Sequence, residues 1–198
     1  MAITAIVNAL GVIPSAGVGV AEKICGFILM VPSAYMQAMS AFVAQNMGAG
    51  RPDRAKKALI GAIGTSLAVG VILSYFSFFH GGLLAQLFAR DAAVIAAAAE
   101  YLKAYAVDCL LVSFLFCIIG YFNGCGRTAF VMIQGIAGAF LVRISVSWMM
   151  SRVQPVSLFG VGLATPASTV VQLLLCAGYF VWMHHREKKM PAVPFVVE

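Results

Sequence analysis

The sequence predicts an all-α fold: a polytopic bundle of transmembrane helices, with about five full spans and a partial first helix. Three observations predict it. First, 62% of the 198 residues are hydrophobic and 10% are charged, whereas soluble domains are about 45–50% apolar and about 25% charged. Second, the mean hydropathy is +0.97, and a soluble fold of this size has too little interior to bury so much apolar surface. Third, basic residues gather in short polar segments between long apolar runs.

Five apolar segments are long enough to span a bilayer. A span takes about 20 helical residues, because each adds about 1.5 Å across about 30 Å of hydrocarbon. The predicted spans are Ile24–Asn46, Ala58–Phe79, Ala104–Phe122, Ala129–Met150 and Phe159–Met183. We interpret the stretch before Glu22 as the end of a partial helix, and it lacks the basic leader of a signal peptide. Residues 1–190 are therefore expected to form a single membrane lobe, and residues 191–198 a cytoplasmic tail.

The segment Leu83–Lys103 is more polar than the spans around it. Asp91 is placed to cap a helix that begins at Ala92. We expect an outer interfacial segment that continues into the third span, and a simple extension of that span is the alternative. At the end of the third span and just beyond it, Gly120 and Gly124 have the spacing of closely packed membrane helices, although glycine hinges would have the same spacing.

The basic residues predict the orientation of the chain. The connections after the first, third and fifth spans carry eight of them: Arg51, Arg54, Lys56, Lys57, Arg127, Arg186, Lys188 and Lys189. The alternate connections carry Lys23, Arg90, Lys103 and Arg152. Because basic loops stay in the cytoplasm, we expect a cytoplasmic carboxy terminus. The net charge of +6 is thus assigned to membrane loops, and no Arg–aromatic interleaving suggests a nucleic-acid partner.

Asp108 is the only acidic residue inside a predicted span. It lies 15 residues before Asn123, so about 22 Å from the cytoplasmic turn. Arg143 lies 15 residues after Thr128 on the next helix, so the two charges are expected at matching depth. Intramembrane carboxylates are costly and usually mark ion pathways. Three interpretations of Asp108 stay open: a site for a coupling cation, a structural pair with Arg143, or a polar residue at the outer edge.

Four other polar side chains in apolar segments are candidates to line a substrate cavity: Tyr35, Gln37, Gln134 and Gln172. An unpaired amide is costly in lipid, so each should face protein or water, and plain interhelical hydrogen bonding is the alternative. The cysteines lack the spacing of metal ligands, so no metal site is expected. There is no catalytic constellation or phosphate-binding loop, so neither an enzyme nor an organic cofactor is expected.

Several segments resemble the multidrug and toxic compound extrusion (MATE) family. VPSAYMQAMSAFVAQNMGAGRPDRAKKAL (Val31–Leu59) is similar to the second helix of a family lobe and its Q-N-x-G-A-G-basic turn. YFNGCGRT (Tyr121–Thr128) resembles the turn between the fourth and fifth helices. FLVRISVSWM (Phe140–Met149) and FGVGLATPASTVVQ (Phe159–Gln172) resemble the last two helices of the lobe. The resemblance covers nearly the whole chain, in order.

The resemblance implies two six-helix lobes around a central cavity, with this chain as the carboxy-terminal lobe. Ala21–Lys23 would then be the turn after a truncated first helix. It also implies a bacterial inner-membrane antiporter that exports drugs or organic cations in exchange for Na⁺ or H⁺ by alternating access. Asp108 would lie about one turn from an acidic cation site of some members, and a missing lobe or second half would complete the transporter.

Two other functions stay open at this point. The first is an inactive or assembly-only half-transporter fragment. The second function is that of a relative that flips lipid-linked oligosaccharides. Such proteins tend to carry many basic residues in the cavity, whereas Arg143 is the only basic residue inside a predicted span.

Overall fold

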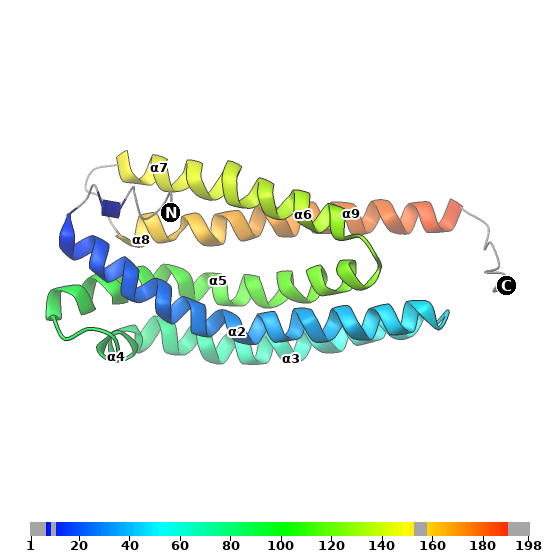
Figure 1. Cartoon of the computed structure of the whole chain (residues 1–198), viewed down its shortest axis with the longest axis horizontal. Helices are drawn as coiled ribbons and strands as arrows, with labels where there is room; N and C mark the ends of the chain where they lie inside the picture. Colours follow the sequence, from blue (N-terminus) through cyan, green and yellow to red (C-terminus); the bar gives the residue numbers. More distant parts are fainter. Residues whose placement is uncertain (1–6, 9–10, 153–157, 190–198) are drawn as a thin grey trace.

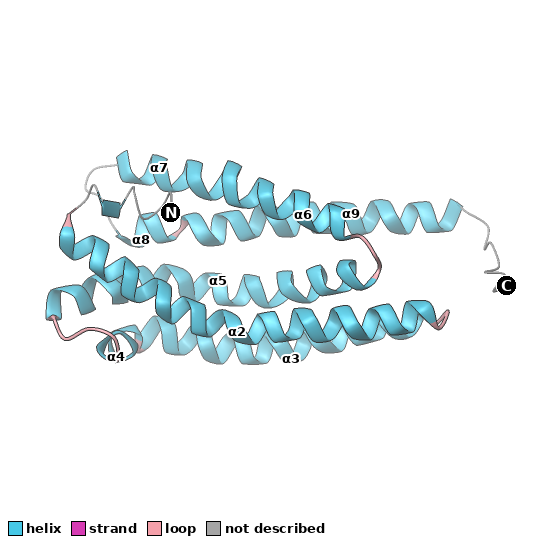
Figure 2. Ribbon diagram, viewed as in Figure 1, coloured by secondary structure: helices cyan, strands magenta, loops and turns pink. Residues whose placement is uncertain are grey.

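The computed structural model describes residues 7–8, 11–152 and 158–189. The predicted all-α class is confirmed, because every secondary-structure element of these residues is a helix, and Figure 2 shows short loops between the helices. The elements are α2 (Val12–Gly48), α3 (Pro52–Phe79), α4 (Gly81–Gln86), α5 (Ala92–Gly124), α6 (Thr128–Ile136), the π-helix η1 (Ala137–Arg143), α7 (Ile144–Arg152), α8 (Leu158–Gly162) and α9 (Ala164–Lys189).

Five helical stretches of the described chain are long and apolar enough to cross a membrane. They are Val12–Gly48, Pro52–Phe79, Ala92–Gly124, Thr128–Met150 and Leu158–Met183. Each contains one of the five spans predicted from the sequence and extends it at one end or both. The fourth is assembled from α6, η1 and α7, and the fifth from α8 and most of α9.

The turn expected at Ala21–Lys23 is wrong, because α2 runs without a break from Val12 to Gly48. Alanine, glutamate and lysine are all good helix formers, so a charged pair alone does not end a helix. The break lies instead at Gly11, whose φ of 116° is a conformation that glycine adopts readily. Before it, Val7 and Asn8 are helical, and the rest of the predicted partial helix lies outside the described residues.

The polar segment before the third span forms the short helix α4 and the first turns of α5. The predicted cap is confirmed: the backbone N–H of Ala93 donates to Asp91 Oδ1 over 2.8 Å. This bond satisfies one of the free N–H groups at the start of α5. From there α5 continues as one helix to Gly124, so the segment joins the third span directly. The tail predicted at residues 191–198 lies outside the described residues.

Helix α5 is the centre of the bundle. It packs against α2, α3, α8 and α9, and in Figure 1 it runs between the pair α2 and α3 and the layer of α6–α7 and α9. In its most apolar window 61% of the residues are buried, against 17% for α3. The outer helices therefore expose most of their apolar side chains, as expected where the surroundings are lipid.

Two glycines of α5 allow it to pack closely against α2. A Cβ atom at Gly120 would lie 2.5 Å from the carbonyl oxygen of Met36. At Gly124 it would lie 2.6 Å from the Cβ of Val43. The backbones touch where no side chain intervenes, so the spacing noted in the sequence serves helix packing.

The helix ends divide between two ends of the bundle. Figure 1 places the α2–α3 turn, the α5–α6 turn and the end of α9 together, with α4 and the start of α9 at the opposite end. The first group is the one that carries most of the basic residues in the sequence. The alternation of basic and less basic connections thus matches the two ends of the folded chain.

Candidate functional site

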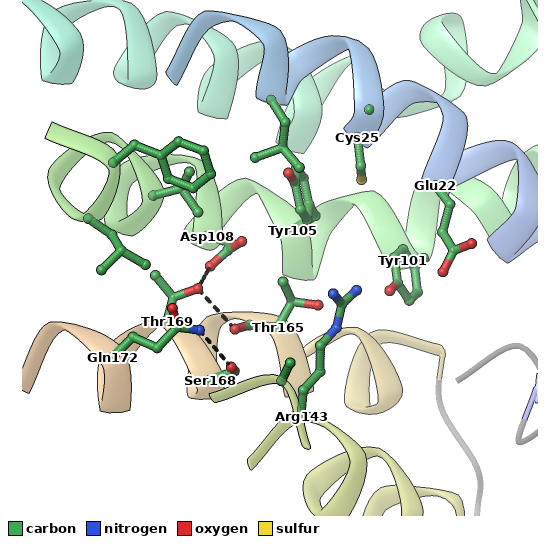
Figure 3. Close-up of a pocket in the computed structure, with 16 residues that line it drawn as sticks. Glu22, Cys25, Tyr101, Tyr105, Asp108, Arg143, Thr165, Ser168, Thr169 and Gln172 are labelled. Carbon is green, nitrogen blue, oxygen red and sulfur yellow. Dashed lines mark hydrogen bonds between the residues drawn. The ribbon is translucent and has the colours of Figure 1, made fainter. Parts of the chain in front are cut away.

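A cavity of about 360 Å³ lies among α2, α5, η1 and α9. Figure 3 shows side chains from these elements pointing into it. Its polar lining consists of Glu22, Cys25, Tyr101, Tyr105, Asp108, Arg143, Thr165, Ser168, Thr169 and Gln172. All of these residues lie on helices that are long and apolar enough to cross a membrane, so the cavity concentrates polar groups inside an apolar bundle.

Asp108 lies on the buried side of α5 with only 1% of its surface exposed. Thr169 of α9 donates its hydroxyl to Asp108 Oδ1 over 2.6 Å. The same hydroxyl lies 3.1 Å from the carbonyl oxygen of Thr165, a longer contact. A hydroxyl has one proton, and the shorter, charge-assisted bond to the carboxylate is the stronger of the two.

The lining of α5 follows helical periodicity. Tyr101, Tyr105 and Asp108 are spaced by four and three residues, so they share one face of the helix. Tyr101 and Tyr105 are both buried. The tyrosine rings supply the apolar packing of the core, and their hydroxyls provide polar tips at the cavity.

A polar stripe on α9 forms the opposite wall. Thr165, Ser168, Thr169 and Gln172 recur every three or four residues and so share a helix face. Gln172 Nε2 donates to Ser168 Oγ over 3.2 Å, and Ser168 Oγ donates to the carbonyl oxygen of Gly138 over 2.8 Å. This chain of bonds joins α9 to η1.

The π-helix η1 interrupts the fourth span and ends at Arg143. Such segments are rare and are found frequently at functional sites. Gly138 fits it to α9, because a Cβ atom there would collide with the side chain of Gln172. The wider turns of η1 change the direction of the residues that follow, and Figure 3 shows the Arg143 guanidinium pointing into the cavity.

Asp108 and Arg143 line the same cavity, in agreement with their expected matching depth. They do not form a direct ion pair: Asp108 is held by Thr169. Arg143 Nε is buried and has no hydrogen-bond partner among the described residues. The cavity therefore contains both signs of charge, separated from one another.

The structure brings three of the six predicted site residues together: Asp108, Arg143 and Gln172. Gln134 is buried in α6 at 2% exposure, away from the cavity lining, and its Oε1 has no partner in the described chain. Tyr35 is half-buried against the core cluster that includes Met39 and Phe122. Gln37 is exposed on α2.

Seven of the ten polar lining residues were not predicted from the sequence: Glu22, Cys25, Tyr101, Tyr105, Thr165, Ser168 and Thr169. A signal was available for the three on α9, since polar residues recur at helical spacing from Thr165 to Gln172. No group of three or more His, Cys, Asp or Glu side chains comes together in the described residues. A cation in the cavity would meet the carboxylates of Asp108 and Glu22 and several hydroxyl oxygens, which are ligands suited to hard cations.

Comparison with known proteins gives consistent matches. The MatE family model matches residues 1–149. Protein DETOXIFICATION 20 of Arabidopsis thaliana is 28% identical over 153 residues, which cover 73% of this chain and 31% of that protein. The probable multidrug resistance protein YoeA of Bacillus subtilis (strain 168) is 25% identical over 184 residues, which cover 92% of this chain and 40% of that protein. The chain therefore spans well under half the length of these relatives.

Solved structures share the fold. A MOP superfamily transporter from Pyrococcus furiosus superposes with a TM-score of 0.82 at 20% identity, over 90% of this chain and 39% of that one. A structure of MATE in the bent conformation gives a TM-score of 0.81 at 22% identity, over 90% of this chain and 40% of that one.

Proposed function

The chain belongs to the MatE family, and from this membership we propose that it forms one lobe of a transporter that exports drugs or organic cations in exchange for Na⁺ or H⁺. It is an integral membrane protein, and its described residues include five apolar helical stretches long enough to span the bilayer. We further propose a location in the bacterial inner membrane. A second lobe would complete the cavity wall, and alternating access of the two lobes would move the site between the membrane faces.

The observation that carries the proposal is the buried carboxylate of Asp108 in a polar cavity inside the spans. A lone carboxylate at membrane depth costs about 2.5–3.5 kcal/mol on insertion scales. Binding one positive charge removes much of that cost, whether the charge is on a proton, a Na⁺ ion or an organic cation. Because a single carboxylate accommodates one of these at a time, competition for Asp108 would couple the inward ion to the outward drug.

The hydrogen bond from Thr169 fits this role. It orients Asp108 through one carboxylate oxygen, Oδ1, and does not use the other, Oδ2. An arriving cation can then bind without breaking the contact between α5 and α9. The exchange would therefore alter charge in the cavity while the scaffold around Asp108 stays in place.

Substitution of Asp108 by asparagine tests the proposal. We expect D108N to lower ion-driven ethidium export by roughly tenfold or more, because the amide is isosteric but cannot take up a cation's charge. The measurement is ethidium efflux from proteoliposomes with an imposed Na⁺ or H⁺ gradient, which also identifies the coupling ion. D91N is the matched control, since asparagine caps a helix as well as aspartate does.

The opposing outcome is equally clear. If D108N folds normally and still couples ethidium export to the gradient, Asp108 does not carry the exchange. If the unaltered chain transports no ethidium under either gradient, the assembly-only interpretation is favoured.

A further inference from the structure

Arg143 brings a positive charge into the cavity from the end of η1. A guanidinium carries five N–H donors in a planar fork. Within the described chain, its Nε is buried and has no hydrogen-bond partner. A buried donor without an acceptor is costly, and a guanidinium donor binds anionic oxygens most strongly, so the arrangement points to a partner of opposite charge.

The two carboxylates that line the cavity do not supply this partner. Neither Glu22 nor Asp108 forms an ion pair with Arg143 in the described part of the structure, and Asp108 accepts the Thr169 hydroxyl. In Figure 3 the guanidinium points into the cavity, with Asp108 on one side and Glu22 on the other. Tyr101 and Thr165 line the same cavity and add hydroxyl groups to its wall.

The backbone that carries Arg143 is held in place. Ser168 donates to the carbonyl oxygen of Gly138 in η1 over 2.8 Å. Gln172 packs directly on Gly138, where a Cβ atom would not fit. These contacts fix the π-helix backbone against α9 at Gly138, so the segment that carries Arg143 is anchored beside the cavity.

We propose that Arg143 binds a carboxylate of the transported molecule, so that the cavity selects zwitterions by pairing their cationic end with Asp108 and their acidic end with Arg143. The inference rests on the proposed function and specifies its substrate class. Arginine binds carboxylates through two parallel hydrogen bonds. The cavity volume of about 360 Å³ falls within the range of small-molecule sites, so it can hold both ends of one compound.

A pair of dyes that differ by one negative charge tests this assignment. Tetramethylrhodamine is a zwitterion, and its methyl ester keeps the cationic ring but lacks the carboxylate. Fluorescence anisotropy with the purified chain in detergent gives the Kd of each dye. We expect R143Q to raise the Kd of the zwitterion by roughly ten- to hundredfold, because a charged hydrogen-bond partner is lost. The Kd of the ester should stay the same or fall in R143Q, since the substitution removes a positive charge that repels the cationic ring.

Two further variants sharpen the experiment. R143K keeps the charge without the fork and should lose part of the zwitterion affinity. R127Q makes the same exchange at an exposed turn and should leave both Kd values unchanged. D108N should raise the Kd of both dyes by a similar factor, because both carry the cationic ring.

The ratio of the two Kd values decides the outcome, since a general folding defect affects both dyes alike. An unchanged ratio in R143Q overturns the inference, and so does an unaltered chain that binds only the ester. Both of these results leave the proposed export of cations standing. An unaltered chain that binds neither dye contradicts the inference and the proposed function together.

Discussion

Thr169 determines how the Asp108 carboxylate is accommodated inside the bundle. Its hydroxyl lies 2.6 Å from Asp108 Oδ1, and both side chains are buried. Valine has nearly the same shape but no donor. We expect T169V to lower the free energy of unfolding by about 1.5–3 kcal/mol, the usual contribution of a hydrogen bond to a charged group. The check is the midpoint of thermal unfolding in detergent.

The matched variant at this position is T169S, which keeps the hydroxyl and loses one methyl group. It should retain most of the stability that T169V loses. Equal unfolding midpoints for T169V and the unaltered chain would show that the bond to Asp108 contributes nothing to stability.

The residues that line the cavity differ in how easily they can be identified from the sequence. Asp108 and Arg143 were found because charges are rare in apolar spans. Threonine, serine and tyrosine are common in apolar spans, so Thr169 and Tyr105 do not stand out individually as cavity residues. Tyr35 and Gln37 illustrate a different limit. The spacing of Gly120 and Gly124 is visible in the sequence, but the face of α2 that they contact is known only from the folded chain.

Among the elements, the spans were predictable and their irregularities were not. Length and apolar composition are sufficient to locate five helices of at least 18 residues. The π-helix Ala137–Arg143 follows from packing on Ser168 and Gln172, residues far away in sequence. The continuity of α2 through Ala21–Lys23 contradicts the predicted turn, because a charged pair of good helix formers does not end a helix.

The contact between α5 and α2 gives a prediction at this scale. G120A should lower the free energy of unfolding by about 1–3 kcal/mol, because the new methyl group would lie 2.5 Å from the Met36 carbonyl oxygen and force the helices apart. Thermal unfolding in detergent measures the effect.

Gly178 provides the control for this substitution. It lies on α9 with no atom within 4 Å of an added Cβ, so G178A should be neutral or slightly stabilising. A G120A chain as stable as G178A would contradict the close packing of α5 on α2.

For the whole molecule, the distribution of basic residues predicts the orientation in the membrane. Arg90 lies before α5 and Arg127 after it, so the two positions should face opposite sides. In a chain with its five cysteines replaced by alanine, an impermeant maleimide should label R90C in intact cells and R127C only after permeabilisation. The reverse pattern would place the carboxy terminus outside, and the cysteine-free chain is the control.

The hydrogen bond between Asp108 and Thr169 joins residues 61 positions apart. A ribosome adds about 5–20 residues per second, so Asp108 is synthesised roughly 3–12 s before its partner. During biosynthesis the third span must therefore enter the bilayer carrying an unsatisfied carboxylate. The same span has the highest mean hydropathy of the five, at 2.1. Its apolar side chains would drive insertion through that interval, before the last helix arrives.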